Sequence, residues 1–75
     1  MAFHNRGQAK GKLGDYKGML EDCTRAIELD PQYAVAFNSR GHAKGELGDY
    51  KGELEDCTKA IELDPGYAVV FNNRP

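Results

Sequence analysis

Small and apolar residues recur at intervals of three and four along two stretches of this sequence. The residues of this pattern are Leu20, Cys23, Thr24 and Ile27 in the first stretch and Leu54, Cys57, Thr58 and Ile61 in the second. An α-helix turns once every 3.6 residues, so this spacing gathers them into one stripe and leaves charged residues on the opposite side. The pattern therefore predicts one amphipathic helix in each stretch.

A weaker apolar pattern before each stretch predicts a second helix. The anchors of these earlier helices are Phe3, Ala9 and Leu13, and then Phe37, Ala43 and Leu47. Gly14 and Gly48 follow the last anchors, where a glycine can end a helix in the left-handed conformation. The next residues, Asp15 and Asp49, can accept hydrogen bonds from the N–H groups that open the following helix. Each helix is thus expected to join the next through a tight turn.

An aspartate-proline pair follows each amphipathic stretch, at positions 30–31 and 64–65. Aspartate is a common helix cap, and proline is favoured at the first helical position, where its missing N–H is not needed. We therefore expect Asp30 to cap a new helix that begins at Pro31.

The sequence repeats itself with a period of 34 residues. Residues 3–36 align without gaps on residues 37–70, with 26 of 34 positions identical, and residues 71–75 match the start of a third copy. Such a period is typical of stacked repeats, in which each unit buries its apolar face against its neighbours. The sequence therefore predicts one all-α domain over residues 1–75, built from antiparallel helix-turn-helix repeats.

The second copy resembles the tetratricopeptide repeat. The matching residues are Phe37, Gly41, Ala43, Gly48, Asp49, Tyr50, Ala60 and Pro65, in the order and spacing of that family. The resemblance implies a short right-handed α-solenoid with a concave groove lined by the first helix of each repeat. It also implies a protein that binds peptides or other proteins. Such proteins are rarely catalytic, so we do not expect an enzyme.

Two pairs of positions depart from the family pattern. Met19 and Glu53 stand early in the second helices, where the family typically has a small alanine, and Gly11 and Gly45 stand where it often has a bulky residue. A buried carboxylate without a partner costs several kcal/mol or becomes protonated, so we expect Glu53 to be partly exposed.

Family geometry implies a polar set of groove residues. The candidates are His4, Asn5, Gln8, Lys12, Asn38, His42, Glu46 and Asn72. Amide side chains carry donors and acceptors, so a row of them could pair with the backbone of an extended peptide. The alternative is that these residues are only a solvated helix surface, and polarity alone does not separate the two interpretations.

One subfamily binds the acidic tails of chaperones through two lysines, two asparagines and an arginine. The matching positions here hold His4, Gln8, Ser39, Val69 and Asn73, so an acidic chaperone tail is not expected as a ligand. Arginines recur at positions 6, 40 and 74, beside the implied groove. We expect them to pair with an acidic residue of a neighbouring helix.

Charge and composition reduce the number of partner classes that the protein is expected to bind. The 75 residues contain 10 Lys and Arg against 12 Asp and Glu, a net charge of −2, and both signs are scattered. This distribution argues against nucleic acid and anionic membranes as partners. There is no run of about 18 apolar residues and no secretory signal, and the two cysteines suit reduced thiols, so a cytoplasmic location is expected.

No arrangement of residues predicts an enzyme, a metal site or a cofactor. His4 and His42 occupy non-equivalent positions, and Cys23 and Cys57 are a whole repeat apart, too far for the roughly 7 Å limit of a disulfide. Asp22 and Asp56 are repeated acids that we assign to the outward face. The cysteines are expected to be small buried hydrophobic residues.

Two functions remain open from the sequence. The first is a protein interaction module that binds a peptide or protein surface in its concave groove. The second is a minimal or engineered repeat that associates with itself as a homo-oligomer, through head-to-tail stacking or helix exchange. High identity between the copies favours the second. The differences at positions 4, 5, 8, 12 and 19 favour the first, because most of them lie on the helix that would contact a ligand.

Overall fold

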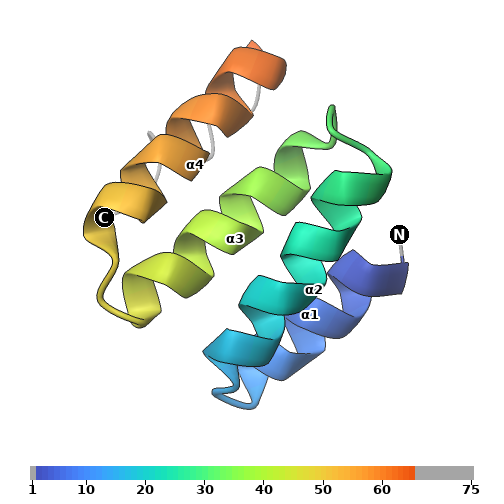
Figure 1. The fold of residues 1–75 in the computed structure, drawn as a ribbon, viewed down its shortest axis with the longest axis vertical. Coiled ribbons are helices and arrows are strands. Elements are labelled where there is room, and N and C mark those ends of the chain that lie inside the picture. The colour runs from blue at the N-terminus through green and yellow to red at the C-terminus, as the bar shows by residue number, and fades with distance from the viewer. Residues whose placement is uncertain (1, 66–75) are drawn as a thin grey trace.

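In the part of the chain that the structure describes, four helices form two antiparallel pairs (Figure 1). They are α1 (Ala2–Lys12), α2 (Tyr16–Leu29), α3 (Ala34–Glu46) and α4 (Tyr50–Leu63). This computed structural model describes residues 2–65, so the expected start of a third repeat, with Asn72 and Arg74, lies outside the described residues. No strand occurs within residues 2–65, and none of the helices there is long and apolar enough to cross a membrane. The all-α prediction is confirmed.

The turns within the two pairs form as the sequence predicts. Gly14 and Gly48 adopt positive φ angles of 86° and 93°. The Gly18 N–H donates to the Asp15 carboxylate at 3.0 Å, and the corresponding Gly52 N–H donates to Asp49 at 2.9 Å. Each aspartate therefore satisfies a backbone donor that the first turn of a helix leaves open.

The expected helix start at Asp30 and Pro31 is wrong. Helix α3 begins at Ala34, and Asp30 instead ends α2 by donating its N–H to the Ala26 carbonyl at 2.9 Å. The Asp30 carboxylate accepts a hydrogen bond from the Gln32 N–H at 3.1 Å, which forms a local turn. A residue before proline avoids the helical conformation, and Asp30 is extended with a φ of −143°. Proline therefore separates the repeats here and does not open a helix.

Glycines bring the two helices of each pair close together. A Cβ at Gly7 would lie 3.2 Å from the Asp22 Cβ, and one at Gly41 would lie 3.1 Å from the carbonyl oxygen of Glu53. A side chain at either position would force α1 from α2, or α3 from α4. The helix pairs therefore pack nearly backbone to backbone at these two points.

Gly11 and Gly45 explain how the large residues at positions 19 and 53 fit. A Cβ at Gly11 would lie only 2.6 Å from the Met19 Sδ, and one at Gly45 would lie 2.5 Å from the Glu53 Oε1. In each pair the long side chain of the second helix occupies the space that the glycine of the first leaves empty. Glu53 is partly exposed, as expected.

Small residues dominate the core. Among residues 2–65, the apolar residues with a relative exposure of 0% are Cys23, Ala26, Ala36, Ala43 and Ala60. Ala43 of α3 packs against Met19 and Cys23 of α2, and this cluster joins the two repeats. The leucines expected as anchors do not belong to the core, because Leu13 and Leu47 are 86% and 46% exposed at the helix ends.

Candidate functional site

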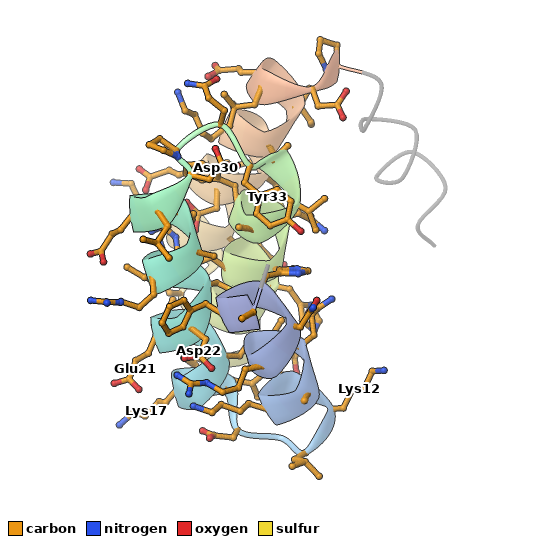
Figure 2. All side chains as sticks on the ribbon, turned by 90° about the vertical axis from the view of Figure 1, so that its right-hand side faces the viewer. Lys12, Lys17, Glu21, Asp22, Asp30 and Tyr33 are labelled. Carbon is orange, nitrogen blue, oxygen red and sulfur yellow. The ribbon has the colours of Figure 1, made fainter. Side chains whose placement is uncertain are left out.

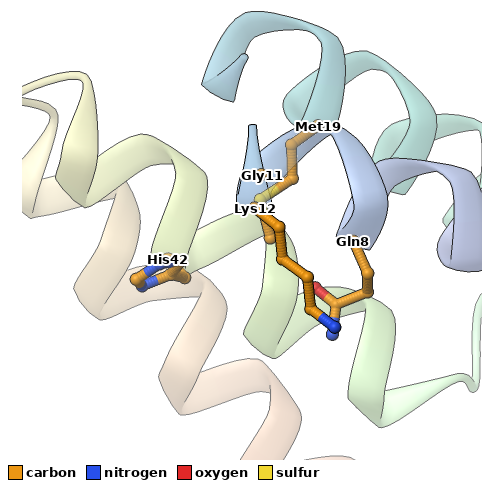
Figure 3. Close-up of a pocket in the computed structure, with 5 residues that line it drawn as sticks. All are labelled: Gln8, Gly11, Lys12, Met19 and His42. Atoms are coloured by element: carbon orange, nitrogen blue, oxygen red, sulfur yellow. The ribbon is translucent and has the colours of Figure 1, made fainter. Parts of the chain in front are cut away.

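A pocket opens between the first helices of the two repeats (Figure 3). Its volume is about 270 Å³. Three helices supply its lining residues, which are Gln8, Gly11 and Lys12 of α1, Met19 of α2 and His42 of α3. Lys12 lies on the opposite side of the molecule from Lys17 and Glu21 of α2 (Figure 2). The pocket is therefore separated from the charged outer face of the second helices.

The pocket depends on a small residue of α1 that faces a large residue of α2. Because Gly11 has no side chain, the thioether of Met19 reaches the pocket and forms an apolar part of its wall. The His42 ring makes an edge-to-face contact with the ring of Tyr16, with the two centroids 6.0 Å apart. Polar groups around the apolar wall are thus an amide, an ammonium and an imidazole.

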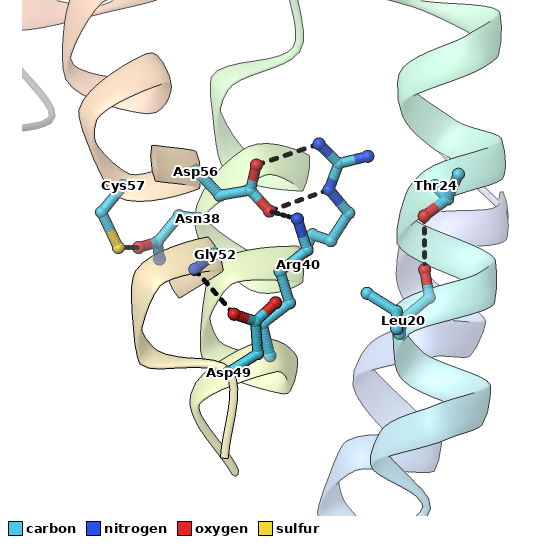
Figure 4. Close-up of polar contacts among 9 residues, drawn as sticks. Leu20, Thr24, Asn38, Arg40, Asp49, Gly52, Asp56 and Cys57 are labelled. Carbon is cyan, nitrogen blue, oxygen red and sulfur yellow. Dashed lines mark hydrogen bonds and ion pairs between the residues drawn. The ribbon is translucent and has the colours of Figure 1, made fainter. Parts of the chain in front are cut away.

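The predicted groove residues divide into several groups in the structure. Gln8, Lys12 and His42 meet at the pocket. Asn5 and Glu46 are exposed, and His4 is buried. The remaining two differ: Asn38 is half-buried and accepts a weak hydrogen bond from the Cys57 thiol at 3.9 Å (Figure 4), and Asn72 lies outside the described residues.

His4 forms an inter-repeat contact that the sequence did not reveal. Its Nε2 lies 3.0 Å from the Ser39 Oγ, and its ring meets that of Tyr33 edge-on with centroids 5.4 Å apart. Burial lowers the pKa of His4, and the positive chain N-terminus lowers it further. His4 and Ser39 are 7% and 5% exposed and do not line the pocket, so this serine-histidine pair connects α1 to α3. The feature of the sequence that could have indicated this contact is that the repeats differ at both positions.

Asp22 and Asp56 are buried between helices, and their assignment to the outward face is wrong. Their relative exposures are only 3% and 4%. Arg40 makes two hydrogen bonds to Asp56, at 2.8 and 2.9 Å, while Lys44 lies 3.1 Å away (Figure 4). Asp22 has the same arrangement: Arg6 makes two hydrogen bonds to it at 2.9 Å, and Lys10 lies 3.3 Å away. The expected arginine pairing is thus confirmed at positions 6 and 40.

These basic neighbours keep both aspartates ionised. Hydrogen bonds from Arg6 lower the pKa of Asp22 more than its burial raises it, with a further contribution from Lys10. Burial is the largest influence on Asp56 and by itself raises the pKa, but the hydrogen bonds from Arg40 and Lys44 outweigh it. Each aspartate therefore holds a helix pair together as a carboxylate.

The cysteines differ in exposure. Cys23 is fully buried, and burial together with the nearby Asp22 raises the pKa of its thiol to about 11, whereas Cys57 is half-buried. Both are thiols without a disulfide. Among residues 2–65, no three His, Cys, Asp or Glu side chains converge in a way that could hold a metal ion.

Three of the positions at which the repeats differ line the pocket. The two copies differ at eight of 34 positions. Position 8 and its equivalent 42 both line the pocket, as do positions 12 and 19. Position 4 reaches position 39 through the His4 and Ser39 contact. The arginine and aspartate that pair across each helix pair, by contrast, are the same in both copies.

Stacked antiparallel helix pairs with a pocket between their first helices define a helical-repeat protein of the α-solenoid class. A sequence model of the tetratricopeptide repeat matches residues 2–33 and again residues 34–67. The chain therefore belongs to the tetratricopeptide repeat family, as its sequence indicates. Members of this family generally mediate protein-protein interactions and are typically not enzymes. A comparison with curated proteins finds no match.

Proposed function

We propose that this protein is an interaction module that holds a peptide segment of a partner protein in the pocket between α1 and α3. The observation that carries the proposal is the coincidence of the pocket with the positions where the repeats differ. Four of the five lining residues stand at positions where the copies differ, although the copies agree at 26 of 34 positions.

The lining residues suit a peptide. Met19 offers an adaptable apolar surface for a side chain. The Gln8 amide can both donate to and accept from a peptide backbone, and Lys12 can pair with a carboxylate. This combination of an apolar wall and a few polar groups is typical of binding sites that fix orientation through hydrogen bonds. Binding would involve no covalent step.

Selection of peptides from a displayed library of random octapeptides tests this function. We expect peptides enriched on the protein to lose at least about tenfold in affinity when Gln8, Lys12 and His42 are all replaced by alanine. A matched control on the outer face, Lys17→Ala with Glu21→Ala, should leave their binding unchanged. Failure to enrich any peptide, or equal binding to both variants, would refute the proposal.

Self-association is the second candidate, and a different observation favours it. Ala43 of α3 packs on a cluster of α2 that includes Tyr16 and Leu20. The equivalents of these two residues on α4, Tyr50 and Leu54, are 71% and 68% exposed, and Ala9, the equivalent of Ala43, is exposed on α1. Both halves of the inter-repeat contact are thus present at opposite sides of the molecule, where a second copy could join them head to tail.

Molar mass measured by light scattering over a wide concentration range tests self-association. A head-to-tail contact predicts a mass that rises with concentration above 8.3 kDa. The variants Ala9→Glu and Leu54→Glu should each restore the monomer mass, because both would place a charge in the contact. A constant mass of 8.3 kDa for the unmodified protein would exclude this candidate.

A further inference from the structure

Two residues that line the pocket in the first repeat are replaced by residues of different polarity in the second. Lys12 of the first repeat corresponds to Glu46 of the second, and Met19 corresponds to Glu53. The glycines beside them are the same, since Gly11 and Gly45 are equivalent. One repeat therefore offers an apolar wall next to a cation, and the other offers two carboxylates in the same framework.

Glu53 lies where Met19 lies in the first repeat. Its carboxylate occupies the space beside Gly45, because a Cβ there would come within 2.5 to 2.8 Å of its carboxylate atoms. Glu53 is half-buried, and within residues 2–65 no ion pair or hydrogen bond involves its side chain. Asp56, three residues later on α4, has both an arginine and a lysine.

A half-buried carboxylate without a cation has lost part of its hydration and gained nothing in return. A lysine or arginine brought to it would form a charge-assisted hydrogen bond, which is stronger than a bond between neutral groups. Met19 offers no such bond, and Lys12 repels a cation at the neighbouring position. The two repeats therefore favour different side chains of one ligand.

We propose that the groove recognises a peptide segment with an apolar side chain and a lysine or arginine roughly three residues apart. The apolar side chain contacts Met19 beside Gly11, and the basic side chain pairs with Glu53. The Met19 thioether lies beside Gly11 of α1 and the Glu53 carboxylate beside Gly45 of α3, and α1 contacts α3. The spacing follows because neighbouring helices lie about 8–10 Å apart and an extended peptide rises about 3.3 Å per residue. This inference rests on the proposed peptide-binding function and specifies the ligand of that site.

The test uses the same octapeptide library on three forms of the protein. They are the unmodified chain, Glu53→Met, and a double variant in which Met19→Glu and Glu53→Met exchange the two residues. Each substitution introduces a residue that the equivalent site of the other repeat already accommodates beside a glycine. Circular dichroism and thermal unfolding check that all three forms fold.

On the unmodified chain we expect enrichment of peptides with the apolar and basic residues in that spacing. In a labelled synthetic peptide of the enriched sequence, replacing the basic residue by alanine should weaken binding about three- to tenfold. The same replacement should change binding to Glu53→Met less than about twofold. The double variant should bind best to peptides with the apolar and basic residues in the opposite order.

Four results would overturn the inference, and they are distinguishable. The enriched peptides could lack a basic residue, or Glu53→Met could prefer a basic residue as strongly as the unmodified chain does. Either result would remove the role of Glu53 while leaving the peptide-binding function intact. An unchanged order of residues on the double variant would do the same. If no peptide is enriched on any form, the proposed function fails together with the inference.

Discussion

The two repeats have almost the same residues, yet identical side chains lie in different surroundings. Cys23 is fully buried in α2, whereas Cys57 is half-buried in α4. Ala43 is completely buried on α3, and its equivalent Ala9 is exposed on α1. The difference arises because α2 is covered by α3, while within residues 2–65 no helix covers the corresponding face of α4. In a stacked repeat, burial is therefore decided by the neighbouring unit.

Contacts within each repeat show the opposite behaviour. The turn at Gly14 and its aspartate cap recur at Gly48, and the pairing of Arg6 with Asp22 recurs between Arg40 and Asp56. Distances agree within about 0.1 Å in the arginine pairs. A contact that begins and ends inside one unit is copied with the unit, and a contact between units is not.

The largest difference in stability between equivalent variants of the two repeats is expected when a charge is placed at the inter-repeat contact. Ala43→Asp would bury an unpaired carboxylate between α2 and α3 and should destabilise the protein by about 3 kcal/mol or more. Ala9→Asp shares only the helix-propensity cost of roughly 0.5 kcal/mol. Urea unfolding followed by circular dichroism measures both. Similar losses in the two variants would mean that Ala9 and Ala43 have equivalent surroundings after all.

Replacement of the paired arginines should give the next largest difference in stability between the repeats. Arg40→Met leaves the buried Asp56 with Lys44 alone and should cost about 2 kcal/mol. Arg6→Met should cost clearly less, because the Arg6 side chain is 59% exposed and water screens its pair, whereas Arg40 is 20% exposed. Thermal unfolding of both variants provides the measurement, and a larger effect at position 6 would contradict the comparison.

Truncation of the stripe leucines tests the two second helices. Leu20 packs against the inter-repeat cluster, so Leu20→Ala should destabilise by about 2 kcal/mol. Leu54 is 68% exposed, so Leu54→Ala should change stability by less than about 0.5 kcal/mol. The two variants differ only in which copy of the repeat is truncated. Equal losses would show that the face of α4 is covered in solution.

Thiol labelling tests the same contrast without a mutation. In the folded protein, iodoacetamide should modify Cys57 at least about tenfold faster than Cys23, because Cys23 is inaccessible and the pKa of its thiol is raised to about 11. Mass spectrometry of peptides after timed labelling resolves the two sites. In urea the rates should become equal, and equal rates in the folded state would be the contrary result.

Low pH is expected to produce the smallest difference between the repeats, because it destabilises both of them. Asp22 and Asp56 have pKa values lowered by folding, so they stabilise the protein above the unfolded-state value of about 3.9. That stabilisation is lost as pH falls from about 4 through the lowered pKa values. Urea midpoints measured between pH 7 and pH 2 should fall below pH 4. Asp56→Asn should flatten this fall, whereas the exposed control Glu55→Gln should not.

Much of the fold was predictable because it depends on local chemistry. The turns at Gly14 and Gly48 need a residue that tolerates positive φ, and that need is visible in the sequence. The start of α3 was not predictable in this way. Asp30 and Pro31 are suited equally to opening a helix and to ending one, and only the turn that Asp30 makes with Gln32 separates the two uses.

Part of the candidate site was predictable for a similar reason. Gln8, Lys12 and His42 were expected in the groove from family geometry, and the structure places them around one pocket. The role of Met19 was not apparent, because it depends on the empty space at Gly11, eight residues earlier on another helix. His4 looked like a groove residue, but its partner Ser39 belongs to the other repeat.

The sequence by itself determined the repeat, its two helices, the glycine turns and the family, because each depends on residues close together in the chain or on a period of 34. Only the tertiary structure decided which copy of each residue is buried, that Asp22 and Asp56 face inward, and where the pocket opens. Those properties depend on contacts between helices. Identical segments acquire different surroundings when different neighbours cover them, and no local pattern records which neighbour is present.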